Sequence, residues 1–169
     1  MRYYFKENLH FLYADGQLCD ENGQTVYSYE NQTLFLPRID LYKYGTKIGH
    51  VKKQFTFFLR QYDLIYGSEE VASLNQEFTF FRPELSVDGL GWKVKGDFFA
   101  LHYSIYNEED ELIASVDQEI FHLTPHYYID IFDEYNEELI VLLIIAINQF
   151  DKDEAAAANS SAGHSSSNR

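Results

Sequence analysis

The side chains that could do chemistry are a few histidines, two groups of carboxylates and a short run of cations. In the segment HLTPHYYID, His122, His126 and Asp130 recur at even intervals. Imidazole and carboxylate are zinc ligands, but on an extended strand these residues lie too far apart to share an ion unless the chain turns at Pro125. We therefore expect ordinary strand histidines and no metal site. The remaining histidines are scattered: His10, His50, His102 and His164.

Two acidic segments offer oxygen ligands of the kind that calcium prefers. They are NEEDE at 107–111 and DEYNEE at 133–138, and neither has the spacing of an EF-hand loop. We expect solvated acidic turns. Asp97, in KGDFF, is expected at a turn or at the rim of a barrel, since no proton-transfer partner can be named. The sequence also lacks a phosphate-binding loop, a serine elbow, paired CxxC and HExxH, so it predicts no catalytic residue and no cofactor.

The cations stand out because the rest of the chain is acidic. The net charge is −14, and residues 66–169 contain five Lys and Arg against twenty Asp and Glu. Such a field repels nucleic acid. Between 38 and 60 only Asp40 opposes a basic island, in which Arg38 accompanies five candidate ligands for an anion or a lipid headgroup: Lys43, Lys47, Lys52, Lys53 and Arg60. Because Lys52 and Lys53 are adjacent, a strand would point them to opposite faces, and a solvated face remains the alternative.

The elements that must position these residues repeat along the chain. QFTFF at 54–58 returns as EFTFF at 77–81, and the similarity extends upstream of both copies. We expect these segments to be successive copies of one strand. Glycine permits the positive φ that tight turns require, and glycines recur every 22 residues, at Gly23, Gly45, Gly67 and Gly89. With a fifth unit around YNEEDELIASV, the pattern predicts a meander of hairpins with about twelve strands.

The period changes after Phe132. A helix is predicted at about 136–150, and its segment LIVLLIIAI at 139–147 is apolar on every face, although a buried central strand is the alternative. Nine helical residues span about 14 Å, too little to cross a bilayer. Such a helix must be enclosed, so we expect a closed antiparallel barrel around it. The expected core residues of the helix are Leu139, Leu142, Leu143, Ile145 and Ile147.

The chain has the length of one domain. We assign residues 1–150 to the barrel and its helix, and 151–169 to a disordered tail, because DKDEAAAANSSAGHSSSNR has no apolar pattern. No apolar run of signal-peptide length opens the chain, and its single cysteine, Cys19, fits a reducing compartment. The expected location is the cytoplasm, with peripheral membrane contact left open.

Several motifs together resemble the LURP-one-related family. They are GTKIGHVKK at 45–53, the looser GSEEVASLNQ at 67–76 and DELIASVDQ at 110–118, together with WKVKGDFFALHYSIY at 92–106, HYYIDI at 126–131 and the apolar helix. The resemblance covers about residues 2–150. It implies the tubby-like fold that tubby C-terminal domains and phospholipid scramblases share, a twelve-stranded barrel around a central hydrophobic helix. Tubby domains bind phosphoinositide headgroups through basic residues, a role that the basic island could fill.

Fold alone does not fix function. We expect a non-enzymatic binding or scaffold protein whose partner is a protein or a phospholipid headgroup. Two alternatives stay open: peripheral binding of lipid or phosphoinositide headgroups through the basic hairpin, and an enzyme that uses the mouth of the barrel.

Overall fold

The computed structural model describes residues 1–6, 15–32, 38–57, 59–77, 84–121 and 124–162. Within them the chain forms twelve strands followed by one helix. Their bounds are β1 (Arg2–Lys6), β2 (Gly16–Cys19), β3 (Thr25–Asn31), β4 (Arg38–Lys43), β5 (Thr46–Lys53), β6 (Gln61–Tyr66), β7 (Glu69–Glu77), β8 (Glu84–Asp88), β9 (Lys93–Asp97), β10 (His102–Tyr106), β11 (Leu112–Phe121), β12 (Thr124–Ile131) and α1 (Glu137–Ala162).

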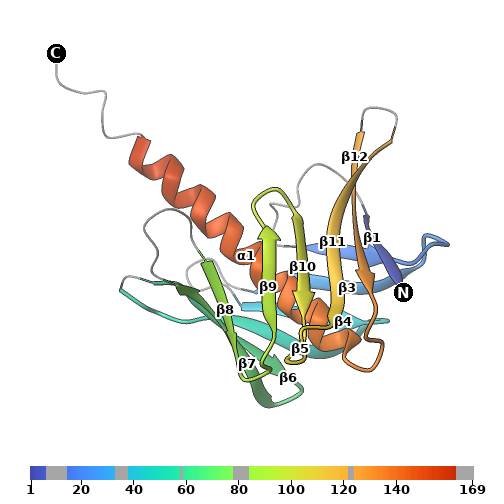
Figure 1. The fold of residues 1–169 in the computed structure, drawn as a ribbon, viewed down its shortest axis with the longest axis horizontal. Helices are drawn as coiled ribbons and strands as arrows, with labels where there is room; N and C mark the ends of the chain where they lie inside the picture. Colours follow the sequence, from blue (N-terminus) through green and yellow to red (C-terminus); the bar gives the residue numbers. More distant parts are fainter. Residues whose placement is uncertain (7–14, 33–37, 58, 78–83, 122–123, 163–169) are drawn as a thin grey trace.

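The strands form a closed antiparallel barrel in which each strand pairs with its neighbours in the chain (Figure 1). The barrel closes where β1 pairs with β12, with Arg2 opposite Asp130 and Tyr4 opposite Tyr128. Closure removes the free edges that a meander would otherwise leave exposed. The fold predicted from the hairpin repeat and the apolar helix is therefore confirmed.

Antiparallel alternation gives the barrel two different ends. The predicted turn glycines Gly23, Gly45, Gly67 and Gly89 all have positive φ and lie between β2 and β3, β4 and β5, β6 and β7, and β8 and β9. We call this end, where α1 also begins, the turn end. The connections from β5 to β6 and from β9 to β10 lie at the opposite end, which we call the aromatic end because they carry QFTFF and DFF.

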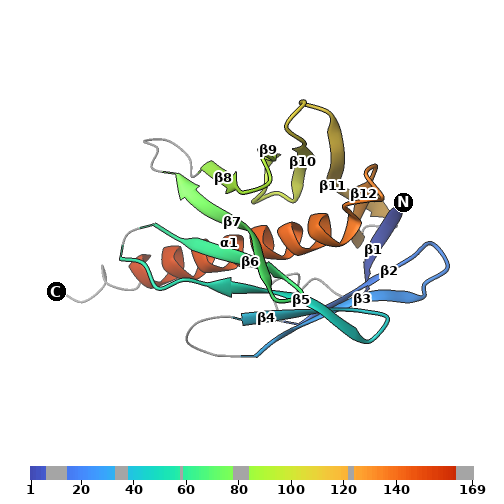
Figure 2. The same cartoon turned by 90° about the horizontal axis from the view of Figure 1, so that it is seen from below.

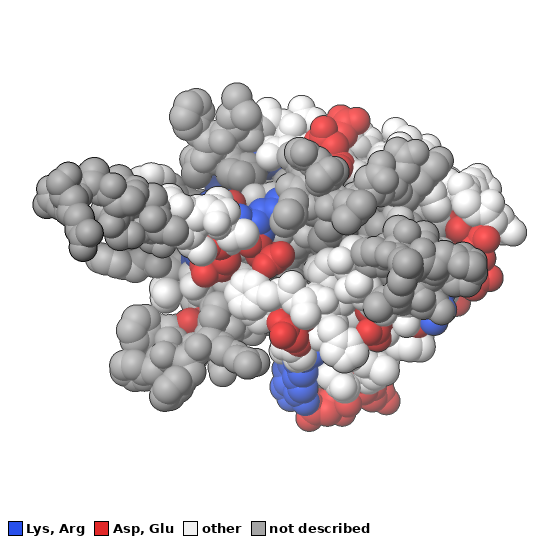
Figure 3. Space-filling view, turned by 90° about the horizontal axis from the view of Figure 1, so that it is seen from above, with Lys and Arg blue, Asp and Glu red and all other residues white. Residues whose placement is uncertain are grey.

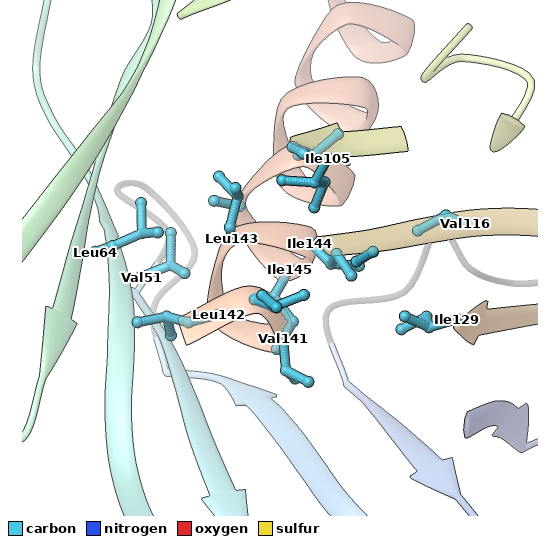
Figure 4. Close-up of a cluster of buried hydrophobic side chains, with 14 of the residues drawn as sticks. Val51, Leu64, Ile105, Val116, Ile129, Val141, Leu142, Leu143, Ile144 and Ile145 are labelled. Carbon is cyan, nitrogen blue, oxygen red and sulfur yellow. The ribbon is translucent and has the colours of Figure 1, made fainter. Parts of the chain in front are cut away.

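Helix α1 runs through the barrel, and its last turns extend beyond the strands (Figure 2). Residues 140–147 are at most 3% exposed on every face of the helix. Leu142 and Leu143 lie beside Val51 and Leu64 on one wall, whereas Ile144 lies toward Val116 on another (Figure 4). The predicted core residues are thus buried, except Leu139, which is only partly buried against the same cluster.

Two predictions about local structure are wrong. The helix does not end near residue 150 but continues to Ala162, so residues 151–162 are helical rather than a disordered tail. Alanine is the strongest helix former, and Asp153 and Glu154 are tied to the barrel by ion pairs, which together offset the missing apolar face. Residues 163–169, including His164, lie outside the described residues.

The segment QFTFF is not a strand. The pairing of β5 with β6 stops at Lys53 opposite Tyr62, and Gln54 N donates to Gln61 O at 2.9 Å to close the connection. Aromatic residues favour strands only where a neighbouring strand offers a surface to pack on, and here the barrel wall has ended. Of the related EFTFF, only Glu77 lies within the described residues.

Candidate functional site

Where α1 enters the barrel, a buried carboxylate receives several donors. Glu137 lies in the first turn of the helix and is 6% exposed. Its Oε1 accepts from Tyr3 Oη at 2.9 Å and also from Tyr27 Oη. Burial and these bonds to Glu137 raise the pKa of both phenols well above their ordinary value. The tyrosines therefore stay protonated as donors, and the carboxylate is held in place.

Lys43, the first predicted anion ligand, belongs to the same group. Its Nζ lies 2.8 Å from Glu138 Oε1 and 3.3 Å from Glu137 Oε1, and Tyr66 Oη donates to Glu138 Oε2 at 2.5 Å. Burial opposes the charge of Lys43, but the bonds to both glutamates outweigh it and raise the pKa of this amine. We call Tyr3, Tyr27, Lys43, Tyr66, Glu137 and Glu138 the entry cluster.

A second group fixes the helix at the aromatic end. Lys53 Nζ lies 2.5 Å from Asp153 Oδ2, and Tyr62 Oη donates to the same oxygen at 2.6 Å. Arg60 pairs with Glu154 and donates to the carbonyl oxygen of Asp153 at 3.2 Å. We call Lys53, Arg60, Tyr62, Asp153 and Glu154 the exit cluster. Two of the predicted anion ligands are therefore engaged with carboxylates of the helix itself.

The remaining candidates lie on the outer wall of β4 and β5. Lys47 Nζ lies 2.6 Å from Asp40 Oδ2, and Arg38 Nε lies 3.1 Å from Asp40 Oδ1. The two cations hold the pKa of Asp40 below its ordinary value against the effect of burial, whereas burial and these same cations lower the pKa of His50. Lys52 is exposed and lies opposite Arg38. We call Arg38, Asp40, Lys47, His50 and Lys52 the outer cluster.

The basic island is therefore not one site. Lys43 lies at the turn end, Lys53 and Arg60 at the aromatic end, and Lys47 and Lys52 on the outer wall. The prediction that Lys52 and Lys53 face opposite ways agrees with this placement, since Lys53 reaches the helix and Lys52 is exposed. The five predicted ligands lie on different surfaces and cannot bind one anion together. Of the three clusters, only the outer cluster has cations on one surface that could bind an anion jointly.

A further polar region surrounds the helix just inside the aromatic end. Burial, with a contribution from the charge of Asp97, raises the pKa of Asp151 to about 6, and burial lowers the pKa of Lys152 to about 8. Among the described residues, Tyr103 Oη, Asn148 Oδ1 and Gln149 Oε1 are buried without a hydrogen-bond partner. A buried polar atom without a hydrogen-bond partner lowers the stability of the folded state. The hydrogen bonding in this part of the barrel is therefore less complete than in the entry cluster.

The predicted histidines and acidic segments are not brought together. His102 Nδ1 lies 2.5 Å from Asp117 Oδ1 on an exposed surface, while His10, His122 and the side chain of His126 lie outside the described residues. In NEEDE, Asp110 pairs with Lys93 at 2.9 Å. Asp97 Oδ1 accepts from Ala100 N at 3.1 Å, the turn role expected for it. No group of three potential metal ligands occurs within the described part of the chain.

Sequence reasoning missed the role of Glu137, which contacts Tyr3, Tyr27 and Lys43. Its position before the apolar run indicated only a favourable charge in the first turn of the helix. A carboxylate that leads an enclosed helix must find donors on the barrel, and the tyrosines of RYYF and TVYSYE were the available signal. Phe55 and Phe57 were also misplaced, since both are exposed rather than part of a strand.

Figure 3 shows Asp and Glu covering more of the viewed face than Lys and Arg, in separate patches. Across the described residues, no helix has the length and apolarity needed to span a bilayer.

Comparison with known proteins gives a family and a fold. Residues 1–148 match the model of the LURP-one-related family. The crystal structure of an Arabidopsis thaliana protein is similar, with a TM-score of 0.54 and 13% identity, over 87% of this chain and 90% of that one. A search of curated proteins finds no significant match.

Proposed function

We infer that this chain, which belongs to the LURP-one-related family, is a non-enzymatic binding or scaffold domain that meets its partners on its outer surfaces. The observation that supports this proposal is the use of the interior: α1 fills the barrel, and the strongest interior polar groups bind one another. The carboxylates of Glu137 and Asp153 accept hydrogen bonds from barrel tyrosines, and each holds the helix. The interior therefore serves stability.

The proposal carries two further assignments. It relates the barrel to the tubby-like fold of tubby C-terminal domains and phospholipid scramblases, in which a hydrophobic helix also fills the centre. It also places the protein in the cytoplasm, because Cys19 is a free, buried thiol of the kind that suits a reducing compartment.

A broad screen of hydrolase, esterase and phosphatase substrates tests the absence of catalysis. We expect no turnover above background for the wild-type protein. Reproducible turnover that Asp151→Asn or Glu137→Gln abolishes, without loss of the folded state by circular dichroism, would show an enzyme that uses the barrel mouth.

The outer cluster supports a second candidate, the binding of an anionic headgroup. Arg38 and Lys52 lie directly opposite each other on neighbouring strands, and Lys47 lies on the same wall. Like charges in opposite positions are destabilising, and a bound phosphate would relieve their repulsion. The buried carboxylate of Asp40 neutralises part of this charge, which leaves three cations against one carboxylate.

Flotation with vesicles that contain a phosphatidylinositol bisphosphate tests the second candidate. Binding should weaken as salt is raised and should fall in Lys52→Ala. The matched control is Lys95→Ala, which removes another exposed lysine on β9, where Lys95 pairs only weakly with Asp110 at 3.6 Å. Equal loss in both variants would mean that the protein responds to net charge and has no headgroup site.

A further inference from the structure

The two ends of the barrel differ in the composition of their connections. At the turn end, 107–111 carries four acidic residues and 20–24 and 132–136 carry two each. At the aromatic end, the described residues of the β5–β6 and β9–β10 connections, 54–57, 59–60 and 98–101, contain no Asp or Glu, whereas Asp15 precedes β2 at the same end. The exposed phenylalanines of the β5–β6 and β9–β10 connections therefore lie at one end of the barrel, and the most acidic connection, 107–111, lies at the other.

The connection from β5 to β6 shows how such residues are presented. Phe55 is 74% exposed and Phe57 is 86% exposed. Their ring centroids lie 5.6 Å apart in an edge-to-face arrangement, and Thr56 Oγ1 donates to Leu59 O within the same connection. The two rings thus contact each other and project into solvent from the connection between β5 and β6.

A second connection, from β9 to β10, contributes another exposed phenylalanine near helix α1. Phe99, between β9 and β10, is 44% exposed, and its ring centroid lies 6.5 Å from that of Phe150. Arg60, at the base of the β5–β6 connection, lies 5.8 Å from the same Phe150 ring. Both connections therefore flank one segment of the helix, at one end of the molecule.

We propose that the aromatic end binds the surface of a lipid bilayer, with Phe55 and Phe57 inserted between the lipids. A pair of exposed aromatic side chains on one connection suits a fluid lipid interface. A stable protein interface instead needs a continuous surface of about 800 Å² per partner. The charge distribution permits this insertion: Lys52 is exposed at the base of the inserted connection, and the carboxylates of Asp153 and Glu154 at this end are paired with Lys53 and Arg60.

This inference rests on the proposed binding role and names the partner. It differs from the headgroup candidate because insertion depends on apolar contact, so it should persist on zwitterionic lipid and at high salt. If vesicles do not bind and no substrate is turned over, this inference fails while the binding role stands.

Sedimentation with phosphatidylcholine vesicles in about 0.5 M salt tests the proposal, since the Debye length is then only about 4 Å. We expect the wild-type protein to bind and the double variant Phe55→Ser, Phe57→Ser to bind at least about tenfold more weakly. The matched control is Tyr135→Ser, because Tyr135 is 96% exposed at the turn end. Circular dichroism should show all three proteins folded, since the altered side chains are exposed.

Depth can be read from tryptophan fluorescence. Phe57→Trp should be quenched by brominated phosphatidylcholine and Tyr135→Trp should not, over a constant background from Trp92, which is 7% exposed. Equal quenching at both positions, or equal vesicle binding by the double variant, would overturn the proposal. So would a double variant that only dissociates a dimer in sedimentation velocity, since the occupant would then be a second copy of the chain.

Discussion

The two halves of helix α1 differ in burial, and different kinds of contact hold each half in the barrel. Residues 140–147 are apolar and enclosed on all sides, whereas Asp151, Lys152, Asp153 and Glu154 are polar and partly exposed as the helix leaves the barrel. The first half is held by burial and by one nearly inaccessible carboxylate. The second is held by side chains that reach across from the rim. The difference teaches that the turn end secures the helix through buried contacts, whereas the aromatic end secures it through partly exposed ones.

The largest difference between the two halves should appear when the same charged side chain is placed in each of them. Leu143 is 0% exposed, so Leu143→Asp should abolish folding, because an unpaired charge in an apolar core is very costly. The same side chain in Ala156→Asp, at an exposed position of the second half, should change the free energy of unfolding by less than about 0.5 kcal/mol. Urea denaturation followed by circular dichroism measures both. A soluble, cooperatively unfolding Leu143→Asp protein would contradict the enclosed helix.

The entry cluster provides the next test. Glu137→Ala leaves Tyr3 and Tyr27 without their acceptor and Lys43 with Glu138 alone. We expect a loss of about 3 kcal/mol in the free energy of unfolding, because buried donors and a charge lose their partner. Glu137→Gln keeps an acceptor oxygen for the tyrosines and should lose less. If both variants unfold at the wild-type urea midpoint, the cluster does not secure the helix.

Much of this architecture could be predicted, because it follows from local rules. A glycine every 22 residues gave the hairpin turns, and an apolar run on all faces required an enclosure. The end of the helix could not be predicted, because residues 151–162 are stabilised by Lys53 and Arg60, about a hundred positions away in the chain.

The site was harder to predict for the same reason. Five cations close in sequence looked like one patch, yet alternation along the strands and the two ends of the barrel separate them. The partners of Lys43, Lys53 and Arg60 lie on helix α1, which sequence proximity could not connect to them, and they are Glu137, Glu138, Asp153 and Glu154. Likewise, QFTFF has the composition of a strand, and only the place where pairing stops shows that it is a connection.

The exit cluster should matter less than the entry cluster. Asp153 is 17% exposed as a side chain, and its removal in Asp153→Ala leaves Lys53 able to reach water. We expect a loss of about 1–2 kcal/mol in the free energy of unfolding, since the partly exposed ion pair contributes little and one buried donor, the Tyr62 hydroxyl, loses its acceptor. Amide hydrogen exchange should show faster opening in residues 151–162 than in 140–147. An effect of Asp153→Ala as large as that of Glu137→Ala would remove the distinction between the two ends.

The smallest effect concerns pH and again separates the halves of the helix. Burial and the charge of Asp97 raise the pKa of Asp151 to about 6 in the folded protein, above the value near 3.8 of an exposed aspartate. The folded state then binds more protons than the unfolded state between about pH 4 and 6, so this residue makes stability fall as pH rises through that window. Because Asp151 is only partly buried, we expect Asp151→Asn to raise the free energy of unfolding by about 1 kcal/mol at pH 7 and by almost nothing at pH 3.5.

Asp97→Asn should give a smaller gain of the same sign, since it removes the lesser cause of the raised pKa of Asp151. Paired urea titrations of variant and wild type at both pH values cancel the other titrating groups, and a gain independent of pH would show that the charge of Asp151 is not responsible.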